Sequence, residues 1–217
     1  LFGRLQPDRD LIGAYTARLA GTVSAVICGH THFDHALDIP EIVRILGCRA
    51  VGGSSLKTLM DISGVSSEVL VCSGNEYLKL EDDIRVRMIP SLHGRVLFGK
   101  IPYAGEIDPS LPPPLKAAHY RLGTMFMPRI EVGGLTLMHA GSANFIESEL
   151  DGQRCDVLFM CVPGWKAVPE YTTRMVNILN PEVIIPFHFD DFTRRIPPSG
   201  NIRTLAFTDM KGFIERV

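Results

Sequence analysis

Several classes of protein are excluded by what this chain lacks. No uncharged apolar run reaches the roughly 18 residues that a membrane-spanning helix needs. The five cysteines contain no Cys-x-x-Cys pair, and their apolar surroundings favour reduced, buried thiols over the alternative of a disulfide. Lys and Arg number 22 against 24 Asp and Glu, so no basic excess favours nucleic acid as a partner.

The remaining composition is that of an ordinary globular protein. The chain has 217 residues, of which 46% are hydrophobic and 21% charged, so disorder is excluded as a global description. No repeat or linker divides it, and we expect a single domain over 1–217. No signal peptide is visible, although the chain begins at Leu1 rather than at Met. We expect a cytoplasmic location, or a periplasmic or secreted one if a segment precedes Leu1.

Apolar and polar residues alternate in the manner of an α/β fold, with a β-rich middle. Helical spacing predicts helices over 8–20, 36–47, 54–62 and 169–179, and a closing helix capped by Thr208. β-branched or alternating runs predict strands at 22–28, 49–52, 68–72, 77–80, 84–90, 125–132, 135–139, 156–161 and 182–187. Residues 103–123 hold four of the 15 prolines. We expect them to form a surface loop, either a lid over the site or a plain connector.

The segment Cys28-Gly-His-Thr-His-Phe-Asp-His carries the chemistry. It places three imidazoles (His30, His32, His35) and one carboxylate (Asp34) directly after a predicted buried strand. Loops after strand ends are where α/β proteins bind ligands. Imidazole nitrogen and carboxylate oxygen suit Zn²⁺, and also Fe, Mn or Ni. The spacing predicts a metal site, in which one pair of these residues faces one metal and the other pair a second.

Two further histidines also follow predicted strands. His93 comes after the strand at 84–90, and His188 comes after the strand at 182–187. With the first cluster they supply two sets of protein ligands. A third residue, His139, lies on the strand at 135–139, where it could hold a metal ligand in place or replace one. His119, in the Pro-rich loop, we expect to be exposed to solvent.

These motifs resemble the metallo-β-lactamase fold superfamily in spacing and order, from about residue 22 to residue 192. The resemblance implies an αββα sandwich with one or two metal ions, commonly zinc, and Mn²⁺ or Fe as alternatives. It implies that His30, His32 and His93 bind the first metal. It implies equally that Asp34, His35 and His188 bind the second. The residues around His30–His35 and those around His188 are most similar to lactonase-like and phospholipase D-like hydrolases.

Two features depart from the family pattern. Only 29 residues precede His30, so either N-terminal strands are missing from this chain or the first sheet is small. Ser142 stands where the family has the Asp that bridges both metals. A hydroxyl is a poorer ligand for a dication than a carboxylate, and we expect the two metals to be held unequally.

The sequence therefore predicts a metal-dependent hydrolase of an ester, lactone or phosphodiester. Asp34 is the catalytic candidate, because it would orient the attacking water and accept its proton. The partner is a small molecule, and an anionic one could pair with Arg95, Lys100, Arg121 or Lys166. Two alternatives remain: an iron-dependent oxidoreductase on the same fold, or a metal-binding protein with reduced catalysis. The sequence carries no signal for an oligomeric state.

Overall fold

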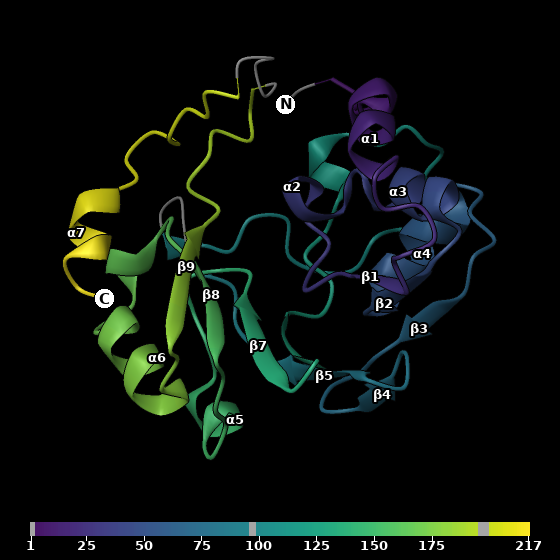
Figure 1. Ribbon diagram of the computed structural model, residues 1–217. Helices are drawn as coiled ribbons and strands as arrows, with labels where there is room; N and C mark the ends of the chain where they lie inside the picture. The colour runs from purple at the N-terminus through teal and green to yellow at the C-terminus, as the bar shows by residue number, and fades with distance from the viewer. Residues whose placement is uncertain (1–2, 96–98, 195–199) are drawn as a thin grey trace. The chain divides into compact units, whose positions relative to one another are not determined.

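The computed structural model describes residues 3–95, 99–194 and 200–217. The chain divides into two compact units, each assembled from two separate stretches (Figure 1). Unit 1 comprises Leu1–Asp82 and Tyr103–Met125, and unit 2 comprises Asp83–Pro102 and Phe126–Val217. Both contain strands and helices, so the predicted α/β class with two helix-flanked sheets is confirmed. The expectation of a single domain stays a prediction.

Unit 1 is built on a small parallel sheet, with the strand order β1-β2-β3. Parallel neighbours need a crossover, and helices lie between the consecutive strands along the chain. The sheet strands are β1 (Ala25–Ile27), β2 (Arg49–Gly52) and β3 (Val69–Val71). The other elements of unit 1 are α1 (Arg9–Thr16), α2 (Phe33–Ala36), α3 (Ile39–Leu46), α4 (Ser54–Ile62), β4 (Tyr77–Lys79) and the 3₁₀ turn η2 (Ala117–His119).

The core of unit 1 lies between its sheet and its helices. Val43 of α3 and Leu56 of α4 are fully buried there, together with Ala50 of β2. Burying a Val or Leu side chain contributes about 1.5–3 kcal/mol, so these contacts fix the helices against the sheet. The sheet thereby holds the end of β1, where the histidine-rich segment begins.

The Pro-rich segment 103–123 is part of this core rather than a detached lid. Its Ile107, Leu115 and Tyr120 are all buried among the residues of unit 1. The Ile107 N–H donates to the Ser55 hydroxyl at 2.9 Å, and the Ser55 hydroxyl donates to Glu106 at 2.5 Å. The apolar residues spaced between the prolines therefore anchor the segment to α4.

Unit 2 carries a mixed sheet in which its strands follow the order β5-β6-β7-β8-β9. The pairs β5–β6 and β6–β7 are antiparallel, and β7–β8 and β8–β9 are parallel. Gly133 and Gly134 join β6 to β7 with φ values of +57° and +82°, as a two-residue hairpin turn requires. The strands are β5 (Ile84–Pro90), β6 (Phe126–Val132), β7 (Leu135–Ala140), β8 (Val157–Cys161) and β9 (Val183–Phe187).

Helices pack against this sheet through a second core. Tyr171 and Met175 of the sixth helix and Phe213 of the seventh are buried among sheet residues such as Leu158 and Met160. This core fixes the strand ends after which His93, Ser142 and His188 follow. The helical elements of unit 2 are α5 (Glu147–Leu150), η3 (Trp165–Ala167), α6 (Tyr171–Leu179) and α7 (Met210–Ile214).

Two predicted helices need correction. The helix expected over 36–47 begins later, as α3 at Ile39, and the short helix α2 precedes it; Pro40 lacks an N–H and so fits only in the first turn of a helix. The closing helix is capped by Asp209 rather than Thr208, since the Asp209 carboxylate accepts the Gly212 N–H at 2.9 Å. Across the described ranges, no helix is long and apolar enough to cross a membrane.

Candidate metal centre

The histidine-rich segment leaves β1 at Cys28, which is held in place from both sides. Its N–H donates to the Val51 carbonyl of β2 at 2.8 Å, and its thiol donates to the His30 carbonyl at 3.0 Å. Burial raises the pKa of the Cys28 thiol to about 12. The sulfur therefore stays protonated and shapes the backbone of the segment instead of offering a thiolate ligand.

His30 and His32 lie close together inside unit 1. Both are buried, their ring centroids are 4.9 Å apart, and one ligand nitrogen of each lies within 4.8 Å of the other. Thr31 between them is tied to the Pro-rich segment: its N–H donates to the Leu122 carbonyl at 3.0 Å and its hydroxyl to the Arg121 carbonyl at 2.5 Å. These bonds fix the backbone between His30 and His32, and so they hold the two imidazoles close together.

Asp34 and His35 extend this cluster from the first turn of α2. The His35 ring centroid is 4.0 Å from that of His30, and His35 Nε2 is 3.6 Å from the Asp34 carboxylate. The helix begins here because the His32 carbonyl accepts the N–H groups of His35 and Ala36. The predicted grouping of the four side chains is thus present within unit 1.

Gly123 is a site-shaping residue that the sequence did not single out. Its φ is +63°, and a Cβ added there would lie 2.9 Å from the Ser55 Cβ and 3.1 Å from the Thr31 hydroxyl oxygen. Only glycine allows the Pro-rich segment to pass this close to the histidine segment. A single glycine in a loop gives no sequence signal for such an approach.

His93 follows β5 in unit 2 and is fixed by its own loop. Its Nδ1 lies 2.7 Å from the Gly94 carbonyl oxygen, which places the proton on Nδ1 and gives Nε2 the lone pair for a metal. The Asn144 side-chain amide donates to the His93 carbonyl at 3.3 Å. The loop after β7 therefore positions the loop after β5.

Ser142 takes part in the same arrangement. Its buried hydroxyl accepts the Gly94 N–H at 2.9 Å. A Cβ at Gly94 would lie 3.4 Å from that hydroxyl oxygen and 3.4 Å from the Ala143 carbonyl oxygen, so the two loops are in close contact. Ser142 thus has a definite structural role, which the sequence did not reveal.

His139 and His188 lie in an aromatic part of unit 2. The His139 ring centroid is 4.4 Å from that of Phe187, and burial lowers its pKa to about 4, so the imidazole is neutral at pH 7. The nearby charge of His188 acts in the same direction. His188 has a φ of +63° and packs edge-on against Phe192 at 5.3 Å. A non-glycine residue in the left-handed region is uncommon, and such conformations cluster at functional sites.

His119 lies outside the histidine cluster. It is half-buried in η2, where its Nδ1 accepts the Lys116 N–H at 3.4 Å. This capping contact gives His119 a local structural role.

The donor set fits a divalent metal ion. Imidazole nitrogens and a carboxylate oxygen are the ligands that zinc and other first-row metals take in proteins. The only thiol in the segment is protonated, so nitrogen and oxygen donors alone define the chemistry of the cluster. The fold is a metal-binding one, with histidines positioned for a metal site.

A two-sheet α/β fold with a histidine cluster after its first strand defines a class of metal-binding proteins. The chain belongs to the beta-lactamase superfamily domain family, whose model matches residues 7–188. No protein of curated function matches significantly.

Several solved structures share the fold of this chain. A metallo hydrolase from the hyperthermophilic archaeon Ignicoccus hospitalis shares 18% identity at a TM-score of 0.54, over 77% of this chain and 64% of its own. A proposed metal-dependent hydrolase from Parabacteroides distasonis shares 12% identity at a TM-score of 0.53, over 82% and 73%. A variant of the β-hydroxylase CmlA shares 13% identity at a TM-score of 0.50, over 79% and 37%. The chain thus spans less than two thirds of the archaeal hydrolase.

Proposed function

We propose that this protein is a metal-dependent hydrolase, with zinc as its metal, that cleaves an ester, lactone or phosphodiester. The cluster of His30, His32, Asp34 and His35 at the end of β1 is the observation that carries the proposal. The residues around the His30–His35 motif and around His188 favour the lactonase-like and phospholipase D-like hydrolases of the family. The metallo-hydrolase neighbours support the general activity, because they share the fold.

The proposed ligand sets follow the order of the motifs along the chain. His93 completes one set with His30 and His32. His188 completes the other set with Asp34 and His35. The Nδ1 contact of His93 supports its part, because it leaves Nε2 for coordination. Each set then holds three protein donors, which is typical of catalytic zinc sites that keep one position open.

The metal, Asp34 and the residues that hold the histidine segment would have different roles in the reaction. When bound, zinc would lower the pKa of a water molecule and polarise the substrate's carbonyl or phosphoryl oxygen. Asp34 would orient the attacking water and accept its proton, since its carboxylate lies beside the imidazoles. Thr31 and Cys28 would keep the histidine segment rigid through their bonds to Leu122, Arg121 and Val51.

A second candidate is an iron-dependent oxidoreductase. The likeness to a β-hydroxylase supports it, because that protein uses the same fold for a reaction other than hydrolysis. The metal itself separates the candidates. Iron in the purified protein, together with oxidation of a substrate and absence of hydrolysis, would favour the second candidate.

The test combines elemental analysis with a panel of lactones, carboxylic esters and phosphodiesters. We expect zinc in the purified protein and hydrolysis of at least one class above a metal-free control. His30→Ala should remove most of the metal and the activity. His119→Ala is the matched control, because His119 lies in η2, and it should keep both. Equal metal content in the two variants would contradict the assignment.

A further inference from the structure

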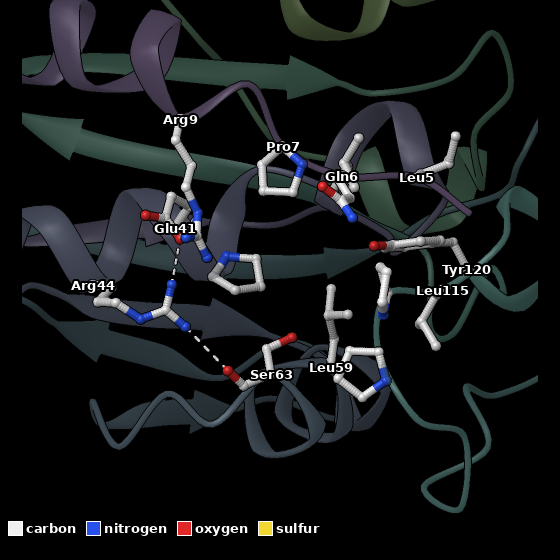
Figure 2. A pocket seen from close by; sticks show the side chains of 14 residues that line it. Leu5, Gln6, Pro7, Arg9, Glu41, Arg44, Leu59, Ser63, Leu115 and Tyr120 are labelled. Atoms are coloured by element: carbon white, nitrogen blue, oxygen red, sulfur yellow. Dashed lines mark hydrogen bonds and ion pairs between the residues drawn. The ribbon is translucent and has the colours of Figure 1, made fainter. Parts of the chain in front are cut away.

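Unit 1 contains a cavity of about 530 Å³ that no residue of the histidine segment lines (Figure 2). We propose that this cavity binds a small amphipathic carboxylate, with a hydrogen-bonding group at the end away from the carboxylate. The site is separate from the proposed hydrolase centre, and its ligand need not be the substrate. Its volume lies within the 300–1,000 Å³ typical of small-molecule sites.

About half of the cavity wall is apolar. Leucines and prolines from the N-terminal stretch, from α3 and α4, and from the Pro-rich segment face it. These residues are Leu5, Pro7, Leu37, Pro40, Leu59, Pro113, Pro114 and Leu115. Rigid proline rings and buried leucines preserve the cavity without a ligand, and an apolar ligand body would gain about 25 cal/mol for each Å² removed from water.

One side of the cavity carries a cluster of three charges. Glu41 is 8% exposed, and its Oε2 pairs with both Arg44 and Arg9, the latter at 3.5 Å. Arg44 is also fixed by a 3.0 Å bond to the Ser63 carbonyl. Two guanidinium groups thus share one carboxylate, which leaves one positive charge in excess.

Arg9 provides the group for the ligand. Within the described ranges it pairs only with Glu41, through Nε. A guanidinium fork of this kind matches a carboxylate with two parallel hydrogen bonds. The Arg9 side chain is 72% exposed, so it can adjust to an incoming anion.

Tyr120 provides a second polar group on the opposite side. Figure 2 shows its hydroxyl pointing into the cavity, although the residue is 4% exposed. This hydroxyl makes no hydrogen bond to any residue that the structure describes. The hydroxyl oxygen is not among the buried atoms that lack a partner, so water reaches it in the cavity, and a ligand that offers a hydrogen bond would replace that water. Burial and the charge of Asp38 raise the pKa of Tyr120 to about 12, which keeps the hydroxyl as a donor.

Asp8 and Asp38 flank the cavity in sequence, but neither lines it. The Asp8 carboxylate accepts the Leu11 N–H as the cap of α1. Partial burial and the charge of Asp8 raise the pKa of Asp38. Among the residues that line the cavity, two guanidinium groups stand against one carboxylate, so the lining itself favours an anion.

Calorimetric titration of the metal-loaded protein tests the proposal with four probes of similar length: decanoate, ω-hydroxydecanoate, decanol and decylamine. We expect decanoate to bind at least about 10-fold more tightly than decanol or decylamine. The ω-hydroxy group should improve binding further by contacting Tyr120. Equal binding of decanol and decanoate, or tighter binding of decylamine, would overturn the proposal.

Variants of the cavity residues, each with a control, show whether decanoate binds in this cavity. Arg9→Gln should weaken decanoate binding about 10-fold, whereas the exposed Arg18→Gln should leave it unchanged. Tyr120→Phe should abolish the advantage of ω-hydroxydecanoate over decanoate and leave the melting temperature unchanged, because the hydroxyl has no protein partner. If decanoate binding survives Arg9→Gln, the carboxylate binds elsewhere, for example at the metal, and the proposal fails. Loss of hydrolase activity or metal would not affect this result.

Discussion

The backbone N–H of Gly94 donates a 2.9 Å hydrogen bond to the Ser142 hydroxyl. Gly94 directly follows His93, and Ser142 stands where the family resemblance implies a bridging Asp. The hydroxyl thus positions a proposed metal ligand through its neighbour. Ser142 therefore has a structural role at this position.

Ser142→Ala should destabilise unit 2 and weaken metal binding. It leaves the buried Gly94 N–H without an acceptor, which costs about 1–3 kcal/mol, and it releases the loop that carries His93. Urea unfolding and a metal titration measure the two effects. Ser110→Ala is the control, because it removes an exposed hydroxyl that bonds locally to Asp108. It should change neither the free energy of unfolding nor the metal affinity. Identical behaviour of the two variants would show that the Gly94 contact is unimportant.

Ser142→Asp should raise the metal stoichiometry toward two. A carboxylate adds one negative charge between two dications, and attraction at a few ångströms is worth several kcal/mol at an effective dielectric of about 20. Titration of the apo protein should show one tight and one weak site before the substitution. Two equally tight sites in the unsubstituted protein, with no gain on Ser142→Asp, would mean that another group already compensates.

Gly123→Ala should destabilise the protein more than Gly64→Ala. Both glycines have nearly the same positive φ, +63° and +65°, so the backbone strain of about 1 kcal/mol is common to both. A Cβ at Gly64 meets nothing within 4 Å, whereas one at Gly123 meets Ser55 and Thr31. Denaturant unfolding and metal affinity compare the two variants. Only Gly123→Ala should lower metal affinity, because only it displaces Thr31.

The five cysteines should react slowly with a thiol reagent in the native protein at pH 8. All five are buried thiols outside any disulfide, and burial raises the pKa of Cys28 to about 12 and the pKa values of Cys72 and Cys155 to about 11. Few thiolates are then present or accessible. Spectrophotometric titration should detect all five only after denaturation. Rapid labelling of one native thiol would reveal a local opening that the packing does not suggest.

The strands were readily predicted because buried β-branched runs give a strong local signal. The run ending at Cys28 and the alternation over 84–90 both correspond to strands of the structure. The helix boundary at Pro40 was missed because an amphipathic pattern continues across it. Thr208 and Asp209 are both good capping residues, so the sequence did not show which of them caps α7.

The candidate site was predicted where chemistry and spacing coincide. The grouping of His30, His32, Asp34 and His35 follows from a short segment after a strand. The contact of Ser142 with Gly94 and the passage of Gly123 beside Thr31 join distant parts of the chain. Such contacts depend on tertiary packing, which leaves no periodic pattern in the sequence.

The interleaved assembly of the two units has a consequence for biosynthesis. A chain made from its N-terminus releases all of unit 1 by residue 125, while β7, β8 and β9 are still to be made. β5 is released earlier, and it must wait for its neighbour β6 to be synthesised. An unpaired strand edge promotes aggregation. Nascent chains that stop near residue 125 therefore present β5 as an unprotected edge, and these are the chains that chaperones would need to shield.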